Sequence, residues 1–185
     1  RKNYFTGTVQ GTRQVGGLMG QFIRGTAIIN NNLSTTSSGT VTANAGGTAV
    51  GGLLGWVQLF ATVDISNSSA GQVTGTASTT NIGGLVGRMH TGTISDSRYD
   101  LDLLGSGQVG GLVGYLGNGA GTMASVAGST ASGNIRGSSD VGGIVGRDVT
   151  DATLEFGDAA SGKNYFTGTV TGKDRVGGLI GRQLN

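Results

Sequence analysis

The chain of 185 residues contains 39 glycines but neither proline nor cysteine, so disulfides and thiolate metal sites are excluded. Twelve basic and ten acidic residues give a net charge of +2, which is too weak to indicate binding to nucleic acid or to a membrane surface. No apolar run is long enough to cross a bilayer. We therefore expect no nucleic-acid partner and no membrane span.

One five-residue word of glycine and aliphatic residues recurs six times, at spacings of 35, 32, 27, 32 and 35 residues. The copies are Gly16–Gly20, Gly51–Gly55, Gly83–Gly87, Gly110–Gly114, Gly142–Gly146 and Gly177–Gly181. A word repeated at a period near thirty indicates an architecture in which each repeat buries its apolar face by stacking on its neighbours. The residues that define this structural repeat are Gly16, Gly17, Leu18, Gly51, Gly52, Leu53, Gly83, Gly84, Leu85, Gly110, Gly111, Leu112, Gly142, Gly143, Ile144, Gly177, Gly178 and Leu179.

The shortest repeat shows the minimal unit in chain order. Its expected parts are a strand at Ile82–Gly87, a turn at Arg88–Gly92, a strand at Thr93–Ser97, a strand at Tyr99–Leu104 and a turn at Gly105–Gly107. Helical periodicity is missing, and glycine and β-branched residues disfavour helix throughout. The pattern predicts an all-β fold, a right-handed parallel β-solenoid (β-helix) with three short strands per coil. The handedness follows the general preference of parallel crossovers.

The repeats run through the whole chain without a change of composition, which predicts a single repeat domain over residues 1–185. It has five to six coils of 27–35 residues, and these begin near residues 15, 50, 82, 109, 141 and 176. The pattern Lys2–Val9 reappears as Lys163–Val170, so we expect a segment of a longer protein. Unpaired strand edges at the ends of such a segment predict self-association when it is made alone.

The third strand of each coil alternates regularly between polar and aliphatic residues, as in Thr40-Val41-Thr42 and Asn134-Ile135-Arg136. Period two predicts an inward aliphatic row. The first strand breaks this alternation, because Leu18 and its equivalents have the opposite parity to their aliphatic neighbours. Either a bend at the two glycines turns both sets inward, or the leucines form an outer row that contacts another sheet or a partner chain.

The residue that follows each word offers a candidate ligand column. After Gln21 the column reads Trp56, Arg88, Tyr115, Arg147 and Arg182, so that aromatic rings alternate with guanidinium groups. Stacked coils would bring these into cation–π contact. The same strip could bind a glycan, because flat aromatic side chains stack on sugar faces. A second outward feature is the Thr-x-Thr pattern of ice-binding solenoids, present at Thr40–Thr42 and Thr169–Thr171 but interrupted in the coils between them.

Catalytic and metal signals are weak. Asp100 and Asp102 are two residues apart, but alignment of the coils places Gln72 and Asn134 beside Asp102, and neither is an acid. Glycoside hydrolysis needs two carboxyl groups within about 5–10 Å, so a polysaccharide-degrading enzyme is only a remote alternative.

The single histidine, His90, is expected to be solvent-exposed in a turn. The acids Asp148, Asp151 and Asp158 lack the spacing of known calcium loops. We expect no enzymatic activity, no metal and no cofactor.

The word Val-Gly-Gly-Leu-Val-Gly, followed by a turn and Gly-Thr-Ile-Ser-Asp-Ser, resembles the GLUG-motif repeat. Such repeats occur in large secreted or surface-attached microbial proteins, including adhesin-like proteins and non-catalytic regions of immunoglobulin A-cleaving peptidases. The second half of the motif fits well at Thr93–Ser97 and fairly at Val63–Asn67. It departs from the pattern at Ala27–Asn30, Met123–Val126 and Leu154–Gly157, which predicts irregular coils there.

The resemblance implies an extracellular or cell-surface location and a structural or adhesive role. We expect a stalk or surface-presenting spacer whose partners are further repeats of the same protein. A ligand-binding solenoid that holds a glycan or ice is the alternative. Self-association through the solenoid ends or through an outer leucine row is a further expectation.

Overall fold

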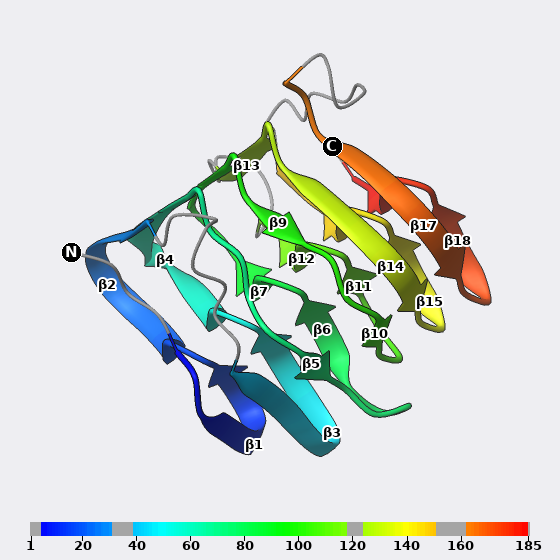
Figure 1. Ribbon diagram of the computed structural model, residues 1–185, viewed down its shortest axis with the longest axis horizontal. Coiled ribbons are helices and arrows are strands. Elements are labelled where there is room, and N and C mark those ends of the chain that lie inside the picture. Colours follow the sequence, from blue (N-terminus) through cyan, green and yellow to red (C-terminus); the bar gives the residue numbers. More distant parts are fainter. Residues whose placement is uncertain (1–4, 31–38, 118–123, 151–161, 185) are drawn as a thin grey trace.

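The computed structural model describes residues 5–30, 39–117, 124–150 and 162–184, and all regular secondary structure among them is β-strand. The chain winds into stacked coils that run from the N-terminal end to the C-terminal end (Figure 1). It is an all-β parallel β-solenoid of about five turns with three parallel sheets. In the described part, no helix is long and apolar enough to span a membrane.

Three sheets form the sides of the solenoid, and every strand pairing in them is parallel. Sheet A contains β1 (Thr8–Gly16), β3 (Thr40–Gly51), β5 (Val73–Thr74), β6 (Thr80–Gly83), β11 (Val109–Gly110), β15 (Ser139–Gly142) and β18 (Asp174–Gly177). Sheet B contains β2 (Met19–Asn30), β4 (Leu54–Ser66), β7 (Val86–Met89), β8 (Gly92–Ser95), β12 (Val113–Leu116), β13 (Ala124–Ala127), β16 (Val145–Asp148) and β19 (Ile180–Gln183). Sheet C contains β9 (Arg98–Tyr99), β10 (Leu103–Leu104), β14 (Thr130–Arg136) and β17 (Tyr165–Thr171).

The glycine words lie one above another. In sheet A, the β-branched residues that precede the words pair in the order Val15, Val50, Ile82, Val109, Val141 and Val176. The repeat seen in the sequence is therefore the coil-to-coil register of the solenoid.

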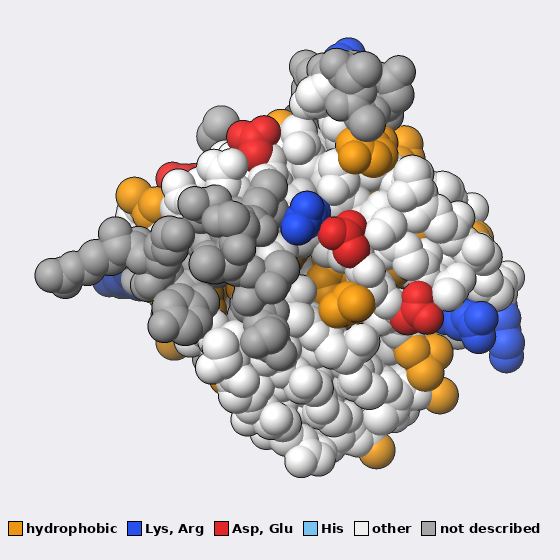
Figure 2. Space-filling model, viewed as in Figure 1, with side chains coloured by type: hydrophobic (Ala, Val, Ile, Leu, Met, Phe, Trp, Pro, Cys, Tyr) orange, Lys and Arg blue, Asp and Glu red, His pale blue; other side chains and the backbone are white. Residues whose placement is uncertain are grey.

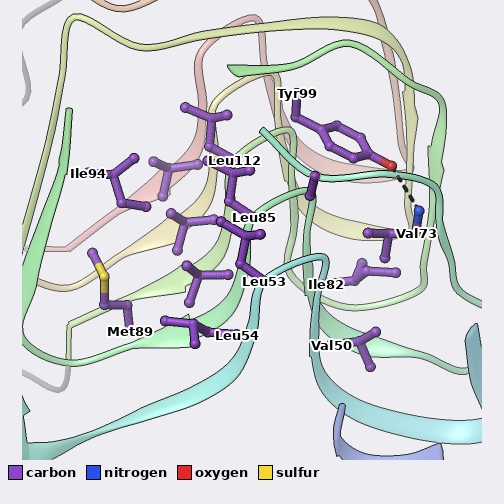
Figure 3. Close-up of a cluster of buried hydrophobic side chains, with 14 of the residues drawn as sticks. Val50, Leu53, Leu54, Val73, Ile82, Leu85, Met89, Ile94, Tyr99 and Leu112 are labelled. Atoms are coloured by element: carbon purple, nitrogen blue, oxygen red, sulfur yellow. Dashed lines mark hydrogen bonds between the residues drawn. The ribbon is translucent and has the colours of Figure 1, made fainter. Parts of the chain in front are cut away.

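The strand expected at Ile82–Gly87 is divided by a corner. Strand β6 ends at Gly83, β7 begins at Val86, and Gly84 with Leu85 makes the corner between sheets A and B. The corner turns the aliphatic residue of the word inward, so its equivalents in the four inner coils are fully buried: Leu53, Leu85, Leu112 and Ile144. Of the two directions left open for the leucine, the structure thus confirms the bend at the two glycines. The expected outer leucine row is wrong for these residues, which form a column in the core (Figure 3).

The two leading glycines of the words are needed because backbone passes very close to them, except at Gly178 in the last word. A Cβ on Gly83 would lie under 3.0 Å from backbone atoms of Val86, Gly114 and Leu112. A Cβ on the second glycine, Gly84, would lie under 3.0 Å from the carbonyl oxygen of Gly111 and from the ring of Tyr99. At equivalent second glycines the inward neighbour is Phe5, Ala70, Ala131 or Phe166. Glycine at these positions allows successive coils to pack closely and leaves room for an inward side chain.

The predicted inward aliphatic row is confirmed. Val41, Val73, Leu103 and Ile135 are each at most 2% exposed, and Val9 and Val170 pack against the same core at the two ends. The residues on either side of each aliphatic residue, which are polar except for Leu104, point outward. The core is therefore one continuous apolar interior along the axis.

A buried polar ladder runs parallel to this core, formed by Ser68, Ser97, Ser129 and Asn164, each at most 2% exposed. The backbone N–H of each serine donates to the side-chain oxygen of the next rung at 3.0–3.1 Å. Each serine hydroxyl in turn donates to a backbone carbonyl two residues earlier in its own coil. The ladder satisfies turn backbone that would otherwise be buried without partners.

The irregular coils expected at degenerate motifs are not found where the structure describes them. Ala27–Asn30 pairs residue by residue with Val63–Ser66, and Ala124–Ala127 pairs likewise with Gly92–Ser95. Backbone hydrogen bonds carry this pairing, so it tolerates changes of side chain. Met123 and Leu154–Gly157 lie outside the described residues.

Candidate functional site

The residues directly after the glycine words form one outward row on sheet B, which we call the ring–guanidinium row. Strand pairing places its members beside one another in successive coils. Along the axis they are Gln21, Trp56, Arg88, Tyr115, Arg147 and Arg182. The alternation of rings and guanidinium groups in the sequence is therefore also an alternation in space.

The arginines of this row cover the faces of its rings. The guanidinium carbon of Arg88 lies 5.2 Å from the ring centroid of Trp56 and 4.7 Å from that of Tyr115. The guanidinium carbon of Arg147 lies 5.5 Å from the Tyr115 centroid, on the side of the following coil. Each contact contributes about 0.5–1 kcal/mol at an exposed site. A sugar could stack on Tyr115 only by displacing an arginine, so this geometry favours a stabilising role.

His90 is buried, contrary to the expectation that it is solvent-exposed in a turn. It is 4% exposed, and its ring meets Trp56 edge to face with centroids 5.8 Å apart. The expected turn over Arg88–Gly92 is only the two-residue link between β7 and β8, which leaves the imidazole against the body of the solenoid. Neither ring nitrogen has a hydrogen-bond partner among the described residues. Burial, with a smaller effect of Arg88, lowers the pKa of His90 to about 4.

Acidification from pH 7 to pH 4 is expected to remove about 3 kcal/mol of stability through His90, at about 1.4 kcal/mol per pKa unit. The pKa is about 4 in the folded protein and 6.5 at its ordinary value. Between these values the unfolded chain binds the proton more tightly, so the free energy of unfolding falls as the pH falls. Urea denaturation at a series of pH values measures this loss.

The variant His90→Leu is the control, because a buried ring without hydrogen bonds can be replaced by an apolar side chain. Other groups also titrate in this range. Burial raises the pKa of Asp148, so its contribution to stability is lost as the pH rises and opposes that of His90. The two proteins are therefore compared at each pH. A difference in unfolding free energy that does not change between pH 7 and pH 4 would contradict the prediction.

The expected acidic pair lies on the face of sheet C, and each acid is held by a polar neighbour. Asp100 forms an ion pair with Arg98 at 3.3 Å and accepts from the Ser132 hydroxyl at 3.1 Å. Asp102 Oδ1 accepts from the backbone N–H of Asn134 at 2.7 Å and from its Nδ2 at 3.0 Å. These bonds lower the pKa of Asp102. A general acid for glycoside hydrolysis needs the opposite shift.

A groove of about 330 Å³ runs over this part of the surface. The predicted neighbours of Asp102 are present: Gln72 Nε2 donates to the Asp102 backbone carbonyl at 3.1 Å, and Asn134 lies on the other side. The groove is lined by Gln72, Val73, Thr74, Gly75, Asp102, Leu103, Leu104, Asn134 and Arg136. Figure 2 shows the face that carries sheet C, where charged side chains form small separate patches among uncharged polar groups and backbone.

The residues directly before and directly after the inward aliphatic row form two outward rows, which contain Asp102 and Leu104 in one coil. Threonine pairs occur on these two rows, but they do not form a continuous array. Thr8 pairs with Thr40, and Thr42 pairs with Thr74. Farther along the axis, Thr169 and Thr171 pair with Asn134 and Arg136. A flat threonine surface is therefore interrupted in the middle coils.

The acids considered for calcium do not form a described cluster. Asp148 is fully buried, and its Oδ1 accepts from the N–H and the hydroxyl of Thr150 at 2.9 and 2.7 Å. Asp151 and Asp158 lie outside the described residues. Within the described ranges no three His, Cys, Asp or Glu residues are grouped so that they could hold a metal ion.

Comparison with known proteins identifies one repeat. Residues 105–136 match the model of the GLUG motif, a stretch that contains the word Gly110–Gly114 and the strands β11 to β14. Comparisons with curated proteins and with solved structures gave no match. The chain thus contains a GLUG motif region, and that region forms part of a β-solenoid.

Proposed function

We propose that the chain is a non-enzymatic structural segment, a stalk or surface-presenting spacer, of an extracellular protein. The observation that carries this proposal is that interactions run from coil to coil along the whole axis. Parallel pairing continues through sheet A from β1 to β18 and through sheet B from β2 to β19. Hydrogen bonds along the axis resist bending and extension of such a rod.

Side chains on two sides of the solenoid support the same role. The buried polar ladder links four successive coils through side-chain hydrogen bonds. The ring–guanidinium row links neighbouring coils through cation–π contacts. These groups have their partners in adjacent coils, as expected for a stiff spacer.

The extracellular location and the partners belong to this proposal. The GLUG match at residues 105–136 supports the location through the surface-attached microbial proteins in which this motif occurs. Among the described residues, strands β18 and β19 each pair on one side only, and Val176 in β18 is 45% exposed. Further coils of the same protein, or the end of a second copy, are suited to cover such an edge.

Deletion of one complete coil, residues 83–109, tests the spacer role. The deletion joins Ile82 to Gly110 and brings Leu53 to Leu112 and Trp56 to Tyr115, so the core and the outward row remain compatible. We expect a folded solenoid that is shorter by about 4.8 Å. Because the chain has no cysteine, spin labels at Thr42→Cys and Thr171→Cys can report the length by double electron–electron resonance.

Deletion of residues 83–96, about half a coil, is the matched control, because it destroys the register and is expected to unfold the protein. Equal loss of structure in the two deletions would contradict the spacer proposal. So would an unchanged label distance in the full-coil deletion.

A further inference from the structure

We propose that the groove formed by β5 of sheet A with β10 and β14 of sheet C binds a neutral oligosaccharide that lies along the solenoid axis. The site lies on a different sheet from the ring–guanidinium row, and it goes beyond a spacer role. Three successive coils contribute to it, with Gln72, Asp102 and Asn134 in one outward row. Two steps between coils span about 10 Å, which is the length of about two linked sugar rings.

The polar groups of the groove are fixed in position before any ligand arrives. Asn134 holds Asp102 through its backbone N–H and its side chain, and Gln72 bonds to the Asp102 carbonyl. From the described residues Asp102 Oδ2 receives a single longer bond, at 3.2 Å, so this oxygen of a groove-lining side chain keeps acceptor capacity. An acceptor held in this way loses little conformational entropy when it binds a hydroxyl.

The outward row directly after the inward aliphatic row, which contains Leu104 and Arg136, supplies a hydrogen-bond donor and an apolar surface. Arg136 is exposed, and its guanidinium makes no hydrogen bond to the described residues, although it lies near enough to Asp102 to lower its pKa. Leu104 lies beside Arg136 in the pairing and is 47% exposed. A sugar presents hydroxyls at its edge and C–H groups on its face. The edge suits Asp102 and Arg136, and the face suits Leu104.

Charge and access favour a neutral sugar at this site. The groove contains one carboxylate and one guanidinium, Asp102 and Arg136, so its net charge is zero. An acidic polysaccharide would meet the carboxylate unfavourably. In the ring–guanidinium row, by contrast, arginines cover Tyr115 from both neighbouring coils and Trp56 from one. A volume of about 330 Å³ lies at the lower end of the range for small-ligand sites.

Titration with cellohexaose, xylohexaose and mannohexaose tests the proposal, with an alginate hexasaccharide as the acidic comparison. We expect saturable changes in the amide signals of Gly75 and Asn134 with at least one neutral sugar in ¹H–¹⁵N correlation spectra. Leu104→Ser and Asp102→Ala should each weaken binding at least tenfold. Thr169→Ala and Thr171→Ala, in the same two rows but outside the groove, should change it less than twofold.

Leu104→Ser alters an exposed side chain, so it separates loss of binding from loss of folding if Asp102→Ala is unstable. The proposal is overturned if no neutral hexasaccharide gives a saturable change. It is also overturned if Leu104→Ser binds like the wild type, or if alginate binds more tightly than every neutral sugar. Because the deletion of residues 83–109 removes Asp102 and Leu104, it should abolish sugar binding while the spacer still folds. The two proposals can therefore fail independently.

Discussion

Replacement of Gly84 by alanine is expected to lower the free energy of unfolding by about 5 kcal/mol or more, at the extreme of single-substitution effects. The new Cβ would lie under 3.0 Å from the carbonyl oxygen of Gly111 in the next coil and from the Tyr99 ring. The carbonyl belongs to a continuous ladder, since Gly84 N–H donates to it at 3.1 Å. Relief of the clash requires the two coils to separate, which breaks pairing on both sides of the corner.

Gly178→Ala is the matched control, because Gly178 holds the same place in the last word. No atom lies within 4 Å of a Cβ added there, so we expect a change of less than about 0.5 kcal/mol. Urea denaturation followed by far-ultraviolet circular dichroism measures both variants. Equal stability of the two variants would show that close stacking of coils does not explain the second glycine of the word.

The repeated word and the period-two strands were sufficient to predict the parallel solenoid and its register. The words align the strands that contain them, and the inward aliphatic residue of each third strand aligns that strand separately, because the number of residues between the two differs from coil to coil. The inward row at Val41 and Val73 and the neighbours of Asp102 could be predicted for this reason. The ring–guanidinium row also follows from this alignment, because one residue per coil falls at each place along the axis.

Other features depend on contacts between sheets, which alignment of coils does not reveal. The corner at Gly84 and Leu85 is a property of the backbone path, and the alternating pattern alone left two directions open for the leucine. His90 is buried because its link between strands is only two residues long. The buried polar ladder had a sequence signal, the serine after Asn67 and Asp96. These two residues have positive φ values of 47° and 48°, which asparagine and aspartate tolerate in tight turns.

Tyr99 is the side chain whose truncation is expected to have the second largest effect. The ring is fully buried over Gly84, and its hydroxyl accepts the backbone N–H of Val73 at 3.1 Å (Figure 3). Tyr99→Ala would empty that space and leave the N–H without its partner. We expect a loss of about 4–5 kcal/mol, as for other buried aromatic residues replaced by alanine.

Tyr99→Phe separates the two contributions, because it keeps the ring and removes only the hydroxyl. A buried N–H left without an acceptor costs about 1–3 kcal/mol, so this variant should be clearly more stable than Tyr99→Ala. Tyr165→Phe makes the same chemical change at a half-buried position and should be neutral. Urea denaturation of the three variants distinguishes the cases. If Tyr99→Phe and Tyr165→Phe have the same free energy of unfolding, the Tyr99 hydroxyl contributes nothing to stability. Packing of the ring over the glycine corner then accounts alone for the aromatic residue at this position.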